Sequence, residues 1–186
     1  MDRQTILDFS SLAAPYADAM IQYAPDYGIV GPYQWAAFLA QTSHESCGYL
    51  HTTELWGPTP AQKTYAANRL NAYPEARQHA ADAGESDVGK FYRGRGLIQI
   101  TFYKNFLDYS QHAYGDERCA KNPAMLAESP DAVRSAMWYW HSRSIDHLSL
   151  ITEEEFRECT KRINGGYNGL QDRIQKWEHA RRILGI

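Results

Sequence analysis

Apolar residues recur along most of this 186-residue chain at the three- and four-residue intervals of amphipathic helices. Pro15 and Pro25 interrupt the pattern, because proline cannot continue a helix. No internal repeat, low-complexity tract or linker divides the sequence, which favours a single folding unit. The pattern predicts helices over residues 4–14, 16–24, 32–47, 102–113, 130–143, 152–163 and 169–184.

Local signals predict how several of these helices begin and end. Thr152 and Glu155 have the spacing of a capping box, and Ser129 before Pro130 is typical of a cap followed by a first-turn proline. Gly48 is expected to end the third helix. The predicted class is therefore mainly α, with at most a small β-hairpin. The less regular stretches are a loop or hairpin over 49–59, irregular helix over 60–83 and an extended, glycine-containing loop over 84–101.

Composition and charge exclude several classes of protein. The length fits one domain, and the hydrophobic content of 44% is ordinary for a globular chain. The longest apolar run in the middle of the chain, residues 35–40, is far shorter than the roughly 20 residues of a membrane span, so no stable membrane association is expected. The net charge of −3 gives no support for a nucleic-acid partner. The three cysteines, which are widely spaced, disfavour a disulfide framework or a zinc site.

The third predicted helix carries a carboxyl group on an apolar face. Glu45 lies three residues after Thr42 and seven after Phe38, so the three side chains share one side of the helix. A carboxyl group there is expected to be partly desolvated, which favours its protonated form, as a general acid requires. From spacing alone, a structural glutamate near a helix end is an equally open interpretation.

Glu54 follows nine residues later, beyond the predicted end of that helix. A turn after Gly48 can bring it back across a cleft towards Glu45. Inverting glycosidases hold two carboxyl groups roughly 6.5–9.5 Å apart, with room for a water between them. Glu54 is therefore a candidate second acid, although spacing alone favours an exposed loop residue. Other candidates for that role are Glu75, Asp82 and Asp87.

A glycine-containing segment supplies further polar groups. On an extended backbone, Gln99 and Thr101 would lie on one side, where an amide and a hydroxyl can position a sugar and a water. The segment is not a phosphate loop, because Gln99 stands where the third glycine belongs. The pair His44-Glu45 is not a zinc-peptidase motif, because Gly48 occupies the place of the second histidine. No metal or cofactor is expected.

Three stretches resemble, in order, the signature blocks of glycoside hydrolase family 19, which contains plant chitinases and a compact branch of phage endolysins. The resemblance runs from about residue 32 to the C-terminus. It implies a lysozyme-like, two-lobed helical domain spanning residues 1–186, with a small lobe at about 50–90 and no separate wall-binding domain. The stretches are Ala-Gln-Thr-Ser-His-Glu-Ser (40–46), Phe-Tyr-Arg-Gly-Arg-Gly-Leu-Ile-Gln-Ile-Thr (91–101) and Ile-Asn-Gly-Gly (163–166).

Residue by residue, the resemblance implies that Glu45 is the general acid, Glu54 the second acid and Thr101 the hydroxyl that holds the attacking water. The plant enzymes place their second glutamate further from the first and carry secretion signals and disulfides. The short spacing of Glu54 is instead similar to that of the endolysin branch. The substrate-binding residues implied are His44, Gln99, Asn105, Asn164 and Arg173, the last as part of the charge network around the acids.

The expected function is cleavage of the β-1,4 glycan strands of bacterial peptidoglycan, by inverting hydrolysis, for host lysis. The alternatives are a chitinase acting on N-acetylglucosamine polymers, a lytic transglycosylase, a cysteine amidase built on Cys47 and a non-catalytic wall-binding protein. We expect the protein to be a monomer. Because the N-terminus shows no signal-peptide pattern, we expect it to lie in the cytoplasm of an infected or lysogenic bacterium. A holin-like partner is expected to release it to the cell wall.

Overall fold

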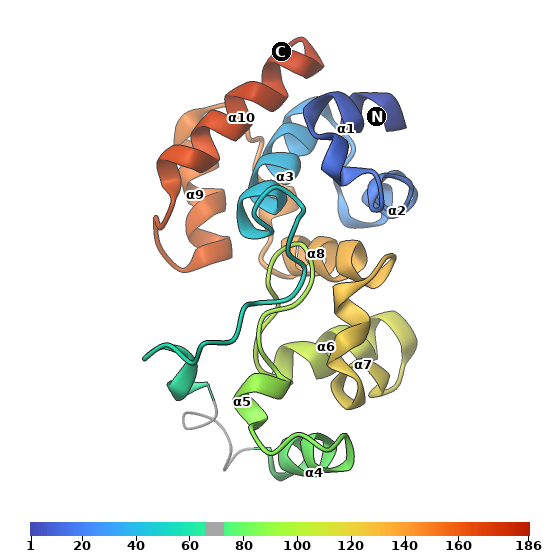
Figure 1. Ribbon diagram of the computed structural model, residues 1–186. Coiled ribbons are helices and arrows are strands. Elements are labelled where there is room, and N and C mark those ends of the chain that lie inside the picture. Colours follow the sequence, from blue (N-terminus) through green and yellow to red (C-terminus); the bar gives the residue numbers. More distant parts are fainter. Residues whose placement is uncertain (66–72) are drawn as a thin grey trace.

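Helices make up most of the regular structure in residues 1–65 and 73–186, the residues that this computed structural model describes. Short 3₁₀ segments lie between several of them. The predicted mainly α class is confirmed. The helices, drawn in Figure 1, are α1 (Arg3–Phe9), α2 (Ala17–Tyr23), α3 (Pro32–Glu45), α4 (Pro74–Asp82), α5 (Val88–Phe91), α6 (Tyr103–Tyr114), α7 (Arg118–Lys121), α8 (Asp131–Ser142), α9 (Glu153–Asn164) and α10 (Leu170–Leu184).

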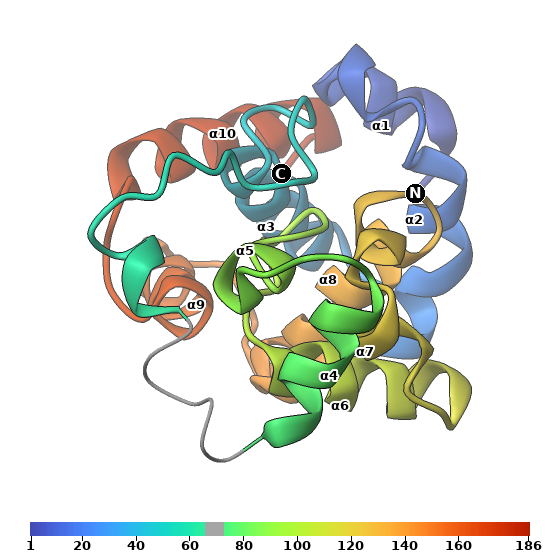
Figure 2. The ribbon, with the colours of Figure 1, turned by 60° about the horizontal axis from the view of Figure 1, so that its bottom comes forward.

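Helix α3 is the buried helix around which the upper half of the molecule packs. Every residue from Trp35 to Ser43 is buried, which explains why its apolar run lacks a polar face. Helix α10 packs along α3, and α1 packs against α10, so the first and last helices of the chain are neighbours (Figures 1 and 2). The C-terminal end of α3 points towards the middle of the molecule, where the catalytic candidates lie.

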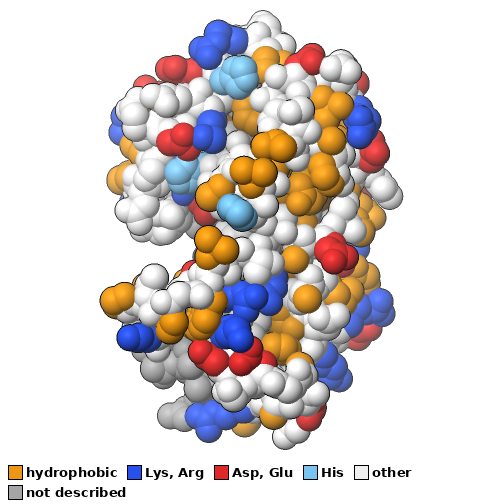
Figure 3. Space-filling view, in the orientation of Figure 1, with side chains coloured by type: hydrophobic (Ala, Val, Ile, Leu, Met, Phe, Trp, Pro, Cys, Tyr) orange, Lys and Arg blue, Asp and Glu red, His pale blue; other side chains and the backbone are white. Residues whose placement is uncertain are grey.

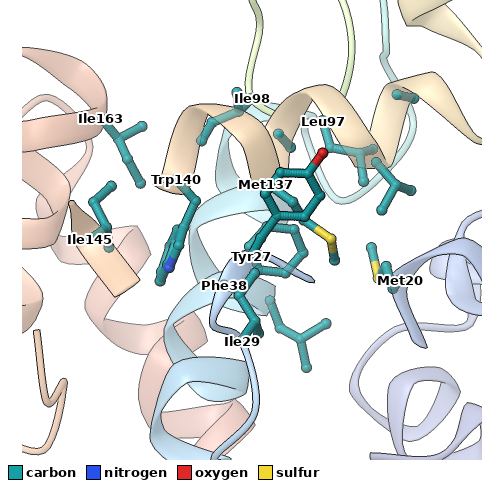
Figure 4. Packing of buried hydrophobic residues seen from close by; sticks show 14 of the residues in the cluster. Met20, Tyr27, Ile29, Phe38, Leu97, Ile98, Met137, Trp140, Ile145 and Ile163 are labelled. Atoms are coloured by element: carbon teal, nitrogen blue, oxygen red, sulfur yellow. The ribbon is translucent and has the colours of Figure 1, made fainter. Parts of the chain in front are cut away.

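The core joins α3 to α8 and to the turn around residue 97 (Figure 4). The rings of Phe38 and Trp140 meet edge to face, with centroids 5.6 Å apart, and both side chains are fully buried. Leu97 and Ile98 are buried in the same cluster. Aromatic pairs of this geometry stabilise a fold beyond the area that they bury. The core therefore fixes the turn that carries Gln99 and Thr101 relative to α3.

The start and end of α9 follow the sequence signals. The capping box is confirmed, because Thr152 Oγ1 accepts a hydrogen bond from the Glu155 N–H and the Glu155 carboxylate accepts one from the Thr152 N–H. Gly165, in the left-handed conformation, ends the helix.

Two other helix predictions are wrong in detail. The helix expected over 4–14 is divided, because Ser10 adopts an extended conformation and a 3₁₀ segment follows it. Pro130 is not in the first turn of α8 but precedes it. Asp131 begins that helix and is buried, where the hydroxyls of Tyr109 and Tyr114 donate to its carboxylate.

A left-handed turn reverses the chain after α3. Cys47, Gly48 and Tyr49 have φ angles of 51°, 75° and 70°, three consecutive residues in a region that favours glycine. The helix ends at Glu45, earlier than the predicted Cys47. The turn sends the following segment away from α3 (Figure 1), and that segment brings Glu54 to Gly94, to which it is hydrogen-bonded.

The segment after Gly94 is a tight turn rather than the extended loop that the sequence predicts. Gly96 and Gln99 have positive φ angles of 77° and 56°, which fold the chain so that Arg95 pairs with Ile100. Thr53 pairs with Arg95 from the other side, also antiparallel. These bridges are isolated, and the described part of the chain contains no longer strand.

The space-filling view shows a hollow in one side of the molecule (Figure 3). Its upper wall comes from the region of α9 and α10, and its lower wall comes from the segment that leads to residue 65 (Figures 1 and 3). None of the described helices has the length and hydrophobicity needed to cross a membrane.

Candidate active site

Glu45 and Arg173 form a buried ion pair at the inner end of α3. Arg173 Nη2 donates to Glu45 Oε1 over 2.5 Å, and the exposed fractions of the two side chains are 1% and 15% respectively. Arg173 also donates to Gln41 Oε1 (2.6 Å) and to the backbone oxygen of Asn168 (3.1 Å). In the described part of the structure, Glu45 Oε2 has no hydrogen-bond partner. One carboxylate oxygen is thus held by the protein, and the other is left for a ligand.

A cavity of about 340 Å³ adjoins Glu45, within the range of roughly 300–1,000 Å³ that is usual for ligand sites. It brings together five of the predicted site residues from four structural elements. They are Glu45 of α3, Gln99 and Thr101 of the turn after Gly94, Asn105 of α6 and Asn164 of α9. Tyr139 of α8 and Ile163 of α9 complete the upper side. The lining residues are Glu45, Tyr65, Ile98, Gln99, Ile100, Thr101, Phe102, Asn105, Tyr139, Ile163 and Asn164.

The polar groups on the floor of the cavity are ordered by hydrogen bonds to the backbone. Thr101 Oγ1 donates to the carbonyl oxygen of Gln99 (2.9 Å), which leaves its lone pairs free to accept from a water. Asn105 Nδ2 donates to the carbonyl oxygen of Thr101 (2.8 Å), so its own carbonyl oxygen can accept from a hydroxyl or an amide. Gln99 Nε2 donates to the carbonyl oxygen of Gly96 (3.0 Å). The floor is therefore ordered before any ligand binds.

Glu54 does not line this cavity directly, but it is bonded to Tyr65, which does. Its Oε2 accepts from the Gly94 N–H (2.9 Å), while its Oε1 accepts from Gln62 Nε2 (2.9 Å) and from the hydroxyl of Tyr65 (3.1 Å). Arg95 is buried nearby; desolvation lowers its pKa to about 10, against the opposing attraction of Glu54. Three donors thus fix the Glu54 carboxylate in position.

Tyr65 connects the two carboxyl groups, because it donates to Glu54 and also lines the cavity beside Glu45. Burial, together with the neighbouring Glu54 carboxylate, raises the pKa of Tyr65 to about 12, so its hydroxyl stays protonated at neutral pH. The sequence prediction missed Tyr65 and Gln62, because nothing in the pattern of residues 60–83 marks them.

Two predicted binding residues, His44 and Arg173, do not line the cavity: Arg173 is buried and bonded to Glu45, whereas His44 is bonded elsewhere. Its Nδ1 lies 2.6 Å from Asp172 Oδ2 in α10, and it does not contribute to the cavity lining. Asp172 was not predicted, although its place before Arg173 mirrors that of His44 before Glu45. Among the described residues, no group of three or more His, Cys, Asp or Glu side chains is placed to hold a metal ion.

Comparison with known sequences identifies the family. The sequence profile of glycoside hydrolase family 19, described as chitinase class I, matches residues 25–150. A family 19 domain-containing protein of Haemophilus influenzae is 32% identical over 166 residues, covering 80% of this chain and 78% of that protein. An endochitinase of Arabidopsis thaliana is 32% identical over 171 residues, covering 88% of this chain and 53% of the plant protein. The chain therefore spans about half the length of that endochitinase.

Solved structures share the fold. A bacterial family 19 chitinase superposes with a TM-score of 0.70 at 21% identity, over 97% of this chain and 94% of the other. Chitinase C of Streptomyces griseus gives a TM-score of 0.67 at 24% identity, over 96% and 75% respectively. Together with the profile match and the Haemophilus influenzae relative, these likenesses show that the chain belongs to glycoside hydrolase family 19.

Proposed function

We propose that this protein hydrolyses β-1,4-linked N-acetylhexosamine strands with inversion at the anomeric carbon, using Glu45 as the general acid. One observation carries the proposal: Glu45 is held by the buried Arg173 through one oxygen and lines a polar cavity. A general acid must lie within hydrogen-bond reach of the leaving oxygen and keep a fixed geometry there. The ion pair supplies the fixed geometry.

Glu54 is the proposed base, acting on a water that Thr101 helps to hold. Glu45 lines the cavity and Glu54 stands next to that lining, bonded to the cavity residue Tyr65; inverting hydrolysis requires two carboxyl groups far enough apart to admit a water. Three hydrogen bonds hold the Glu54 carboxylate in a fixed position.

The proposed polymer is the glycan strand of peptidoglycan. Support comes from the nine-residue spacing of Glu45 and Glu54, which is similar to that of the endolysin branch. Chitin is the second candidate, because the matching plant proteins are named endochitinases. The cytoplasmic location, the monomeric state and the release by a holin-like partner are parts of the peptidoglycan proposal.

The test is digestion of purified peptidoglycan and, in parallel, of chitin oligosaccharides. We expect reducing ends from peptidoglycan, with the inverted anomer as the first product seen by NMR. Anhydro ends detected by mass spectrometry would instead identify a lytic transglycosylase, and release of peptides would identify an amidase. Binding to the wall without cleavage of either polymer would identify a non-catalytic wall-binding protein. Cleavage of chitin alone would replace the proposed polymer and keep the proposed chemistry.

A further inference from the structure

Two adjacent residue pairs join α3 to α10. In one pair the acidic residue is on α10, and in the other it is on α3. His44 and Glu45 end α3, and they meet Asp172 and Arg173 in the first turn of α10. His44 Nδ1 lies 2.6 Å from Asp172 Oδ2, next to the bond between Glu45 and Arg173. Neighbouring residues of a helix project about 100° apart, so the two bonds lie on different sides of the contact between the helices.

The pair formed by His44 and Asp172 lies in a site shaped for the imidazole ring of His44. Gly169, which precedes α10, has a φ of 68°, and a Cβ built there would lie 2.5 Å from His44 Nε2. Real side chains do not approach so closely, so only glycine leaves room for this ring position. The ring therefore contacts the backbone of α10's N-terminal turn as well as Asp172.

Asp172 is charged and fixed from a second direction. Lys176 Nζ donates to both of its oxygens, over 2.6 and 2.7 Å. Partial burial opposes ionisation, but the hydrogen bonds from Lys176 and His44 outweigh it and lower the pKa of Asp172. No other described charged residue contacts this pair. His44 thus meets an acceptor whose position is set independently of it.

The geometry of the following chain explains why α3 needs this bond. Three left-handed residues follow α3 almost directly, so its last turn is not continued by further helix. The bond from Arg173 holds one oxygen of Glu45 on one side of the last turn. The bond between His44 and Asp172, one residue away and on another side, constrains the same turn a second time.

We infer that His44 is a positioning residue: through Asp172 it fixes the last turn of α3 and hence the free oxygen of Glu45. The inference rests on the proposed role of Glu45 as the acid. It differs from the sequence-based expectation that His44 binds substrate. In that case His44 variants would change KM, whereas a positioning role affects kcat.

The experiment compares His44→Leu, His44→Asn and Asp172→Ala. Asn is the conservative variant, because its side-chain nitrogen can occupy a place close to that of Nδ1 and donate to Asp172. The matched control is His141→Leu, since His141 Nδ1 lies 2.8 Å from Asp146 Oδ2 in a similar pair outside the cavity. Activity is measured as kcat and KM on the glycan that the wild type cleaves. The second readout is the side-chain Nε–H signal of Arg173 in NMR, which needs no activity.

We expect His44→Leu and Asp172→Ala to lower kcat roughly ten- to hundredfold with little change in KM, because small misplacements of an acid cost rates of this order. The double variant that combines His44→Leu with Asp172→Ala should be no slower than either single variant. His44→Asn should keep kcat within about threefold of the wild type, and the Arg173 signal should shift in His44→Leu but not in His141→Leu. An unchanged Arg173 signal, or a raised KM at constant kcat, would overturn the inference. If the wild type cleaves no glycan but the Arg173 signal still shifts in His44→Leu, the proposed function is rejected and the positioning role stays in place.

Discussion

Glu54 and Gly94 are joined by two hydrogen bonds although they lie 40 residues apart in the chain. The Gly94 N–H donates to Glu54 Oε2, and the Glu54 N–H donates to the Gly94 carbonyl oxygen, each over 2.9 Å. The carboxylate is therefore attached to the same turn that carries Thr101. Any change that displaces Gly94 should move the proposed base relative to the proposed water site.

Gly94→Ala is expected to lower activity without removing a catalytic group. A Cβ at this position would lie 2.7 Å from Gln99 Oε1 and 3.3 Å from the Cβ of Glu54, so both side chains must shift. We expect kcat to fall by about tenfold or more. Gly166→Ala is the control, since its Cβ would meet nothing within 4 Å, and it should behave as wild type in the same assay.

Glu45→Gln is expected to abolish cleavage and preserve the fold. Loss of a general acid costs about 10²–10⁴ in rate, while the amide oxygen of Gln can still accept from Arg173. Glu45→Ala should in addition lower the free energy of unfolding by roughly 3 kcal/mol, because it leaves the buried guanidinium without its counter-charge. Turnover and urea unfolding of the two variants separate these effects. More than a tenth of wild-type activity in Glu45→Gln would reject the acid assignment.

Glu54→Gln should be nearly as inactive as Glu45→Gln if the two carboxylates act together. Residues that act as one unit are not additive, so the double variant should be little slower than either single variant. The kinetics of the three variants on one substrate test this. An active Glu54→Gln would remove the two-carboxylate mechanism and leave Glu45 as the acid.

Thr101→Ala should lower kcat more than it raises KM, whereas Thr101→Ser should be mild. The hydroxyl donates to the Gln99 carbonyl oxygen and can accept from a water, and serine retains both functions. Steady-state kinetics of both variants give the comparison. Equal losses in the two variants would mean that the methyl group, through packing, is the important part of the side chain.

Glu155→Gln should make unfolding less sensitive to acid. Hydrogen bonds from Ser149 and Thr152 lower the pKa of Glu155 to about 2 from an ordinary value of 4.5. Its carboxylate therefore stabilises the folded state fully above pH 4.5, and that contribution is lost as the pH falls towards 2. Because the side chain is exposed, we expect a difference of at most about 1 kcal/mol between wild type and variant at pH 7. The difference should close by pH 2 in thermal unfolding, with glycan cleavage at pH 7 unchanged.

The sequence predicts elements well where the signal is local. The capping box at Thr152 lies where it was expected, because it depends on residues three positions apart. Asp131 shows the limit of such signals. Its place after Pro130 suggests a helix start, but two tyrosines from α6 determine its environment, and their approach is a tertiary event.

The same distinction holds for the site. Five predicted residues share one cavity, and four of them (Glu45, Gln99, Thr101 and Asn164) lie within the family motifs. Tyr65 and Gln62 could not be predicted, since their contact with Glu54 depends on a loop path that no spacing rule determines. Asp172 could have been found from the sequence. Asp172-Arg173 is an acidic residue followed by a basic one, the reverse of His44-Glu45, and this reversed order is a criterion for finding such pairs elsewhere.

The left-handed turn after α3 also exposes a cysteine that can be labelled close to Glu45 in the sequence. Cys47 is exposed two residues after Glu45, whereas Cys119 and Cys159 are buried. Burial raises the pKa of Cys119 to about 11 and also raises that of Cys159, and the thiolate is the reactive form of a cysteine. A maleimide dye should therefore label the unmodified protein at Cys47 alone. Its emission should report the arrival of a polysaccharide near the proposed acid Glu45 in real time, with no engineered cysteine.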